Sequence, residues 1–194
     1  MIAIIKYNGG NVNSVQNALN RLNADSVVTD DFETIHNADK VIFPGVGEAS
    51  STMALLREKG LDRFIPTLQQ PVLGICLGMQ LMCGNNEEGN TRGMGIFDLE
   101  VKRFPPQDLV PHMGWNILHN RRSPLFAGFE QENDCYFVHS YYCELSEYTT
   151  SVCDYILPFS ASLQKDNFFA VQFHPEKSGH AGNEILKNFL KLPL

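Results

Sequence analysis

The stretch Pro71-Val72-Leu73-Gly74-Ile75-Cys76-Leu77-Gly78 joins two kinds of secondary structure within a few residues. Its first five residues form a continuous apolar run, which is typical of a strand buried on both faces of a parallel sheet. Residues 77–82 predict a helix that begins directly after this strand. Strand followed at once by helix is the repeating unit of α/β folds, so this stretch predicts that class.

The same alternation precedes the stretch. An apolar run predicts a strand over residues 2–7, and further strands are predicted over 25–29 and 40–43. Apolar residues at helical spacing predict helices over 12–22, after a turn at Gly9-Gly10, and over 49–59, ended by Gly60. We therefore expect an open α/β fold in which a mixed, mainly parallel sheet carries helices on both faces.

The second half of the chain has a different pattern. Residues 97–104, 135–145 and 168–173 alternate in polarity or are rich in aromatic residues, which predicts strands, and residues 184–192 predict a last amphipathic helix. We expect these strands to extend the same sheet in antiparallel fashion. Because no linker or repeat interrupts the pattern, we expect a single domain over residues 1–194.

Composition excludes several classes of protein. The 194 residues are 43% hydrophobic and 19% charged, which permits a core and excludes a disordered chain. A net charge of −7 without a basic surface disfavours nucleic acid as a partner. No apolar run approaches the ~18 residues of a membrane span, and no signal peptide is recognised. Five cysteines without a CxxC pair disfavour a disulfide framework or a zinc site, so we expect a cytoplasmic protein without metal.

Cys76 lies at the centre of the opening stretch, with Gly74 and Gly78 two residues to either side. This is the pattern of a nucleophile elbow, a turn so tight that only glycines avoid clashes beside the nucleophile. The elbow predicts an exposed thiol at a helix N-terminus, where the thiolate is favoured. Free cysteines are more often small buried hydrophobes, and we expect that structural role for the other four.

A cysteine nucleophile needs a base and a group that orients the base. Among six histidines, only His174 ends an apolar strand and has a carboxylate two residues later, in Glu176. We expect Pro175 to keep this segment extended, so that both side chains point the same way. The pattern predicts a Cys76-His174-Glu176 triad, whereas His174 alone would be better interpreted as structural.

The tetrahedral intermediate of such chemistry needs an oxyanion hole. The backbone N–H of Leu77 is the expected first donor, as in other elbows. The loop Pro44-Gly45-Val46-Gly47, which follows a predicted strand, is the expected source of the second donor at Val46 or Gly47. Alone it would be an ordinary turn, but its glycines allow a peptide to flip at low cost, so the hole could be assembled only when needed.

Several blocks together resemble the class I glutamine amidotransferases, which release ammonia from glutamine for a synthase. The elbow and the His-Pro-Glu segment are shared by the whole class, and the resemblance covers essentially the entire chain. More specific blocks point to the branch that serves histidine biosynthesis; these are Pro111-His112-Met113-Gly114-Trp115-Asn116, Tyr136-Phe137-Val138-His139-Ser140-Tyr141 and Lys177. The chain departs from the family pattern at Asn8, usually glycine, and at Asn86, usually serine.

The resemblance implies roles for further residues. Glutamine would be the substrate, with no cofactor, and its amino and carboxylate groups would be held by Gln80, Glu88, Ser140 and Tyr141. The partner would be a (β/α)₈-barrel synthase subunit that receives ammonia through its core and whose ligand acts on the oxyanion loop. The face toward that partner would contain Asn11, Trp115, Tyr136 and Lys177.

Three alternatives remain open at this point. The chain could supply a different synthase, for example one that amidinates a sugar, because the triad is shared among such enzymes. It could be a noncatalytic partner-binding or regulatory module on the same fold. A Cys-His hydrolase of other amides is disfavoured by the Pro-His-Met-Gly-Trp-Asn block.

Overall fold

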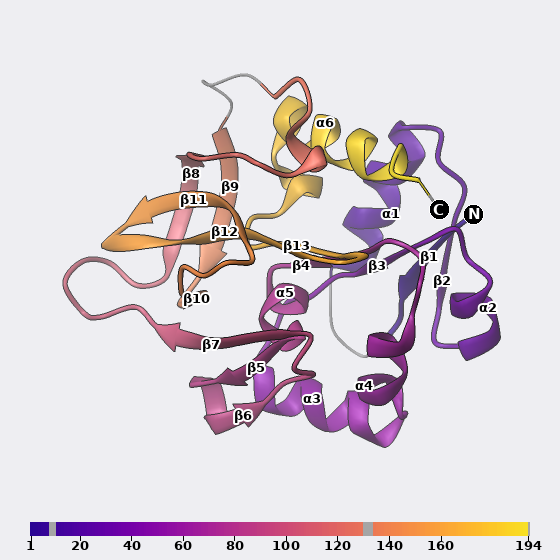
Figure 1. Ribbon diagram of the computed structural model, residues 1–194, viewed down its shortest axis with the longest axis horizontal. Coiled ribbons are helices and arrows are strands. Elements are labelled where there is room, and N and C mark those ends of the chain that lie inside the picture. Colours follow the sequence, from indigo (N-terminus) through magenta and orange to yellow (C-terminus); the bar gives the residue numbers. More distant parts are fainter. Residues whose placement is uncertain (8–10, 130–133, 194) are drawn as a thin grey trace.

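The structure, a computed structural model, describes residues 1–7, 11–129 and 134–193. Within them one large sheet of eleven strands crosses the molecule, and its first half is parallel (Figure 1). The order is β2 (Ser26–Thr29), β1 (Ile2–Ile5), β3 (Lys40–Phe43), β4 (Val72–Ile75) and β13 (Phe168–Val171). All neighbouring pairs in this half run parallel, as predicted.

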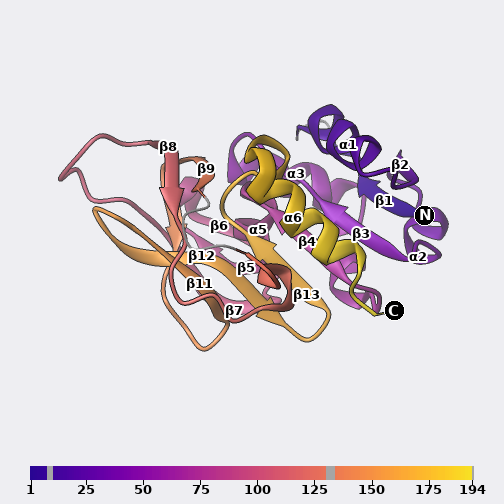
Figure 2. The same cartoon turned by 90° about the horizontal axis from the view of Figure 1, so that it is seen from above.

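Helices cover both faces of the parallel half, which confirms the predicted layers. Successive residues of β1 point to opposite faces of the sheet. Ile4 packs with α1 (Val12–Arg21) and α6 (Gly179–Leu190). Ile5 packs with α3 (Ala49–Glu58) and α5 (Leu77–Met82) on the other face. Figure 2 shows α1 and α6 together on one side of the strands. The short helices are α2 (Phe32–His36) and α4 (Leu61–Phe64).

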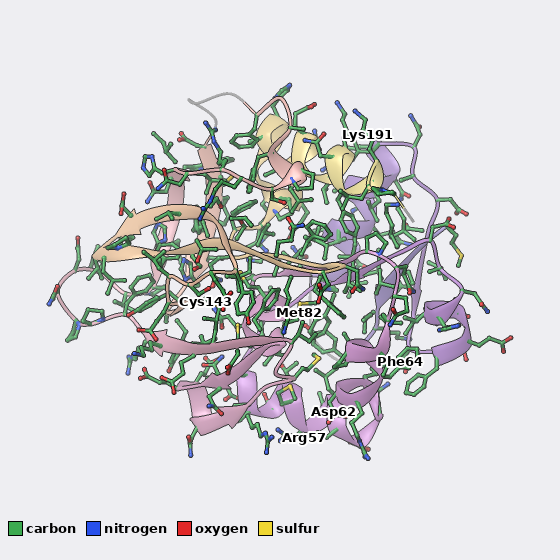
Figure 3. The ribbon with its side chains drawn as sticks, in the orientation of Figure 1. Arg57, Asp62, Phe64, Met82, Cys143 and Lys191 are labelled. Carbon is green, nitrogen blue, oxygen red and sulfur yellow. The ribbon has the colours of Figure 1, made fainter. Side chains whose placement is uncertain are left out.

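The second half adds mostly antiparallel strands, again as predicted. β12 (Leu157–Lys165) pairs with β13, β11 (Thr149–Tyr155) and β10 (Tyr141–Cys143), and β10 pairs with β7 (Phe97–Arg103). The sheet ends with β5 (Cys83–Asn86), parallel to β7, and β6 (Thr91–Arg92). Side chains fill the layers, and the labelled Met82 and Cys143 belong to one core cluster (Figure 3).

The expected strand over residues 135–145 is wrong in one respect, because it is two strands with different partners. β9 (Asp134–His139) pairs with β8 (His112–Ile117) in a separate two-stranded sheet, and the chain turns at Ser140 before β10 joins the large sheet. No strand was expected over β8, whose alternating residues face opposite sides of the ribbon.

The last helix begins at Gly179, before the expected residue 184. Its first turn contains Gly179 and Gly182, which favour helix poorly, so packing decides its start. A side chain on Gly182 would place its Cβ 1.8 Å from the Pro175 carbonyl oxygen, so this turn lies directly against the segment that follows β13. The predicted turn at Gly9-Gly10 and the departure at Asn8 lie outside the described residues.

In the described part of the chain, no helix combines the length and the apolar character needed to cross a membrane.

Candidate active site

Cys76 occupies a strained turn between β4 and α5. Its backbone has φ +51° and ψ −108°, in the region with positive φ that residues other than glycine rarely adopt. The glycines beside it are needed for space. A Cβ on Gly78 would lie 2.1 Å from the Phe43 carbonyl oxygen, and one on Gly74 would lie 2.8 Å from Met82 Sδ. The turn therefore has the geometry of a nucleophile elbow.

The expectation that Cys76 is exposed is wrong, because its relative exposure is only 7%. Segments from the second half of the fold cover the strand ends, and the thiol lines a cavity beneath them. Its sulfur contacts the backbone carbonyl of Val138 at 4.0 Å. Access to the thiol therefore runs through that cavity.

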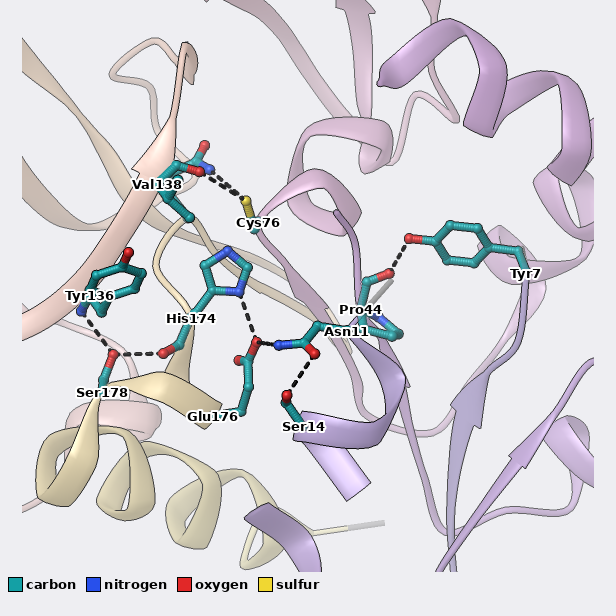
Figure 4. A network of polar contacts seen from close by, with 11 residues as sticks. Tyr7, Asn11, Ser14, Pro44, Cys76, Tyr136, Val138, His174, Glu176 and Ser178 are labelled. Atoms are coloured by element: carbon teal, nitrogen blue, oxygen red, sulfur yellow. Dashed lines mark hydrogen bonds and ion pairs between the residues drawn. The ribbon is translucent and has the colours of Figure 1, made fainter. Parts of the chain in front are cut away.

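His174 follows β13 and lies between Cys76 and Glu176 (Figure 4). Its Nδ1 is 2.8 Å from Glu176 Oε1, and both side chains are 1% exposed. His174 itself is extended before Pro175, as expected, but the segment does not stay extended through Glu176. Pro175–Lys177 forms a 3₁₀ turn, and this turn brings the carboxylate to the ring. Asn11 Nδ2 approaches the same Oε1 at 3.5 Å.

The second ring nitrogen of His174 faces Cys76 and has no other partner among the described residues. Burial opposes protonation of this ring. Interactions with Cys76 and with Glu176 outweigh burial and raise the pKa of His174 to about 10. The arrangement therefore favours an imidazolium between a sulfur and a carboxylate.

Gln172 also contacts the thiol, and sequence reasoning missed it. The residue is fully buried, its Nε2 donates to Cys76 Sγ at 3.6 Å, and its Oε1 accepts from Gln80 Nε2 at 3.0 Å. Gln172 and His174 are two residues apart in the segment that leaves β13, and that spacing could have drawn attention to it.

The predicted oxyanion donor Leu77 N–H is engaged, because it points to the Gly45 carbonyl oxygen at 3.4 Å. The loop is fixed at its start, since Tyr7 Oη donates to the Pro44 carbonyl at 2.6 Å. Farther along, Val46 is 38% exposed and Gly47 has φ +120°. The loop therefore has an anchored half and a half that is freer to reorient.

Cys76, His174 and the residues predicted for the oxyanion hole and for substrate binding line one cavity of about 410 Å³, which can hold a single amino acid. Burial raises the pKa of Glu88, whose carboxylate accepts the Ala49 N–H at 2.8 Å. The lining includes two triad residues, the three hole residues and all four substrate candidates, namely Cys76, His174, Val46, Gly47, Leu77, Gln80, Glu88, Ser140 and Tyr141.

Three of the four residues assigned to a partner face lie together. Trp115 is 56% exposed and meets the Tyr136 ring edge-on at 5.7 Å, and Lys177 Nζ lies 5.9 Å from the centre of the same ring. The fourth, Asn11, is the residue that approaches Glu176. Met113 and Ile117 share the outward face of β8 with Trp115.

All five cysteines are buried and free, with Cys83 Sγ and Cys143 Sγ 3.6 Å apart. Over the described residues, no cluster of three or more His, Cys, Asp or Glu side chains could hold a metal ion.

Comparison with known proteins identifies the family. The sequence model described as Glutamine amidotransferase class-I matches residues 3–192. The imidazole glycerol phosphate synthase subunit HisH of Bacteroides fragilis is 60% identical over 98% of this chain and 99% of its own length. The HisH subunit of Pasteurella multocida is 46% identical over 98% of this chain and 97% of its own.

Solved structures agree in fold. A glutamine amidotransferase superposes with a TM-score of 0.75 at 17% identity, covering 98% of both chains. Another, from Thermotoga maritima, gives 0.62 at 17% identity, covering 98% of this chain and 80% of that one. The family match and the high identity over nearly the full length show that the chain belongs to the class-I glutamine amidotransferases, the family that also contains the HisH subunits of imidazole glycerol phosphate synthase.

Proposed function

We propose that this chain is the glutaminase subunit of imidazole glycerol phosphate synthase in histidine biosynthesis. It hydrolyses glutamine to glutamate and ammonia and passes the ammonia to a cytoplasmic partner, the (β/α)₈-barrel cyclase subunit. One observation carries the catalytic part of the proposal. His174 is held by Glu176 at 2.8 Å while its other nitrogen faces Cys76 on a strained elbow, inside a cavity that suits one amino acid. The 60% identity to a HisH subunit supports the pathway.

The residues divide the chemistry between them. The Cys76 thiolate attacks the side-chain carboxamide carbon of glutamine, and the carbonyl oxygen becomes an oxyanion. The His174 imidazolium gives its proton to the departing nitrogen, so that ammonia leaves and a glutamyl thioester remains. Neutral His174 then takes a proton from water, and the hydroxide so formed attacks the thioester carbon. The C–S bond breaks, which leaves the Cys76 thiolate beside the His174 imidazolium, and glutamate is released as its carboxyl proton passes to solvent.

The oxyanion needs hydrogen-bond donors. In the observed arrangement of the loop at residues 44–47, the expected donor Leu77 N–H is already bonded to the Gly45 carbonyl oxygen. Leu77 N–H becomes available when the Gly45 carbonyl turns away from it. The same reorientation can aim the N–H of Val46 or Gly47 into the cavity, because φ +120° at Gly47 is accessible to glycine. We infer that partner binding drives this change, which would make ammonia release depend on the partner.

The remaining predicted residues bind substrate or partner. Glu88, at the cavity wall, suits the glutamine amino group, and Ser140 and Tyr141 suit its carboxylate. Gln80 also lines the cavity, but both hydrogens of its amide are already donated, to the Tyr141 carbonyl and to Gln172 Oε1. In this proposal the barrel subunit binds the face that contains Trp115, Tyr136 and Lys177. Asn11, beside Glu176, also contacts the barrel.

Labelling tests the proposal directly. A diazo-ketone analogue of glutamine should form its adduct on Cys76, located by peptide mass spectrometry. Cys76→Ala should lower ammonia release, assayed with the barrel subunit, by roughly a thousandfold or more at an unchanged melting temperature. Cys153→Ala, which removes a buried thiol outside the cavity, is the matched control and should retain activity.

An adduct on another residue, or an active Cys76→Ala variant, would contradict this role. A chain that is never labelled in the presence of partner would instead be a noncatalytic module. Product analysis with candidate barrels separates the histidine-pathway synthase from one that amidinates a sugar.

A further inference from the structure

Two buried histidines outside the triad form a cross-strand pair. His112 of β8 lies opposite His139 of β9 in the ladder, and they are 3% and 6% exposed. His112 Nδ1 is 3.1 Å from His139 Nε2. The mechanism above uses neither ring, so their burial needs another explanation.

The hydrogen bonds assign a single proton to each ring. His139 Nδ1 is 2.8 Å from the Tyr141 carbonyl oxygen, which only accepts, so Nδ1 carries the proton. His139 Nε2 is then the acceptor, and His112 Nδ1 donates to it. His112 Nε2 is left to accept from Asn116 Nδ2 at 3.5 Å. Burial lowers the pKa of His112 to about 4 and that of His139 to about 3, in keeping with neutral rings at pH 7.

The same carbonyl connects the pair to the nucleophile. The Tyr141 oxygen also accepts from Gln80 Nε2 at 2.9 Å, and the second hydrogen of that amide goes to Gln172 Oε1 at 3.0 Å. Gln172 is thereby oriented with its own Nε2 toward Cys76 Sγ, at 3.6 Å. The bonds form an unbroken chain from β8 to the sulfur.

Packing leaves each ring little freedom. His112 stacks on Tyr155, with ring centres 4.0 Å apart. The centre of the His139 ring lies 5.2 Å from that of Phe159 and 5.3 Å from that of Phe104. This aromatic surround would also accept an apolar side chain, so packing alone does not require imidazoles here. The hydrogen bonds do require them.

We propose that His112 and His139 are positioning residues for Cys76, which hold the Gln80 and Gln172 amides so that Gln172 donates a hydrogen bond to the thiolate. A bond from an amide N–H to a charged acceptor stabilises that charge, so a misaligned Gln172 leaves the thiol harder to ionise. The inference deepens the proposed function and rests on it for its importance, although the reactivity of Cys76 can be measured without turnover.

The test compares two substitutions of similar size at one position. His112→Asn keeps an N–H close to the place of Nδ1, whereas His112→Leu removes it, and both lose the stacking on Tyr155. The rate at which iodoacetamide alkylates Cys76 is followed against pH by peptide mass spectrometry on the full chain. His112→Leu and Gln172→Leu should each raise the midpoint by about half a pH unit, while His112→Asn leaves it unchanged.

Among the described residues, the titratable groups that interact electrostatically with Cys76 are His174, which Glu176 backs, Tyr7 and Cys143, and all stay the same in these variants. The double variant His112→Leu, Gln172→Leu should shift the midpoint no further than Gln172→Leu alone, because both act through one bond. Additive shifts, equal shifts in the Asn and Leu variants, or no shift in Gln172→Leu would overturn the inference.

Melting temperatures separate this effect from lost stability, since both His112 variants should melt lower by similar amounts. An active Cys76→Ala variant would end the proposed function but would leave these alkylation midpoints as a valid test of the hydrogen-bond chain.

Discussion

At the scale of single residues, Glu176 acts on the Cys76 nucleophile only through the imidazole ring of His174. Its carboxylate is buried against His174. Burial lowers the pKa of this ring, but Cys76 and Glu176 together outweigh burial and raise that pKa to about 10. A raised pKa in the folded state stabilises the fold fully below the unfolded value of ~6.5, and this contribution is lost as the pH rises through about 10.

Glu176→Gln should therefore narrow the active pH range from its alkaline side. The neutral amide no longer supports the imidazolium, so the pKa of His174 falls and the proton donor for ammonia disappears at lower pH. We expect the alkaline limb of kcat to move down by at least about one pH unit. Glutaminase assays across pH with the barrel subunit measure it.

Glu184→Gln removes a carboxylate that pairs with Lys187 on the surface and is the matched control for charge. An alkaline limb that stays in place in Glu176→Gln would contradict the role of this carboxylate.

Sequence alone could bring forward Cys76, His174 and Glu176 as the candidate triad, because glycines around Cys76 and a carboxylate two residues after His174 are local signals. It could not find Gln172, His112 or His139. Their meaning depends on contacts between β8, β9, α5 and the end of β13, which are distant in the chain and carry no local spacing rule. The exposure of Cys76 was mispredicted for the same reason, since the segments that cover it come from the second half.

At the scale of elements, the end of β3 and the start of α5 touch backbone to backbone. A Cβ on Gly45 would lie 2.4 Å from Gly78 N, and one on Gly78 would meet the Phe43 carbonyl oxygen at 2.1 Å. The elbow and the start of the oxyanion loop are therefore in direct contact, which leaves no room for a side chain at Gly45 or Gly78.

Gly78→Ala should damage both stability and activity. The added methyl meets backbone that cannot move aside, so we expect a loss of about 3 kcal/mol in the free energy of unfolding and a strong fall in kcat. Urea unfolding and ammonia assays measure these. Gly128→Ala, at φ +73° with open space around it, should cost only about 1 kcal/mol and retain activity. Equal losses in the two variants would contradict the close contact.

The parallel elements were predictable because strands buried on both faces are rich in apolar residues, as in β3, where three apolar residues follow Lys40, and in Val72–Ile75. The two-stranded sheet of β8 and β9 could not be predicted in this way. β9 and β10 form one polar and aromatic run in the sequence, and only the turn at Ser140 separates their partners.

At the scale of the whole molecule, the outward face of β8 is an apolar surface beside the active site. Met113, Trp115 and Ile117 are 64%, 56% and 40% exposed, and the inward side of the same strand carries His112. Aromatic residues on such surfaces are common anchors of protein interfaces. A partner seated here would rest on the strand from which the hydrogen-bond chain to Cys76 begins.

Trp115 is the only tryptophan, so it reports this docking by itself. Its fluorescence should shift to shorter wavelength when the barrel subunit buries it. Trp115→Ala should raise the dissociation constant of the complex by at least about tenfold. Phe32→Ala is the control, because it truncates an exposed ring on α2 at the other end of the molecule (Figure 1). Unchanged fluorescence with unchanged affinity would place the interface elsewhere.

The place of β13 in the sheet links the fold to the chemistry. This strand lies between β4, which leads into Cys76, and β12, which begins the antiparallel half. The segment that immediately follows β13 contains His174 and Glu176. The strand that joins the two halves of the sheet therefore also sets the base beside the cysteine, so a loss of pairing along β13 would separate the two residues.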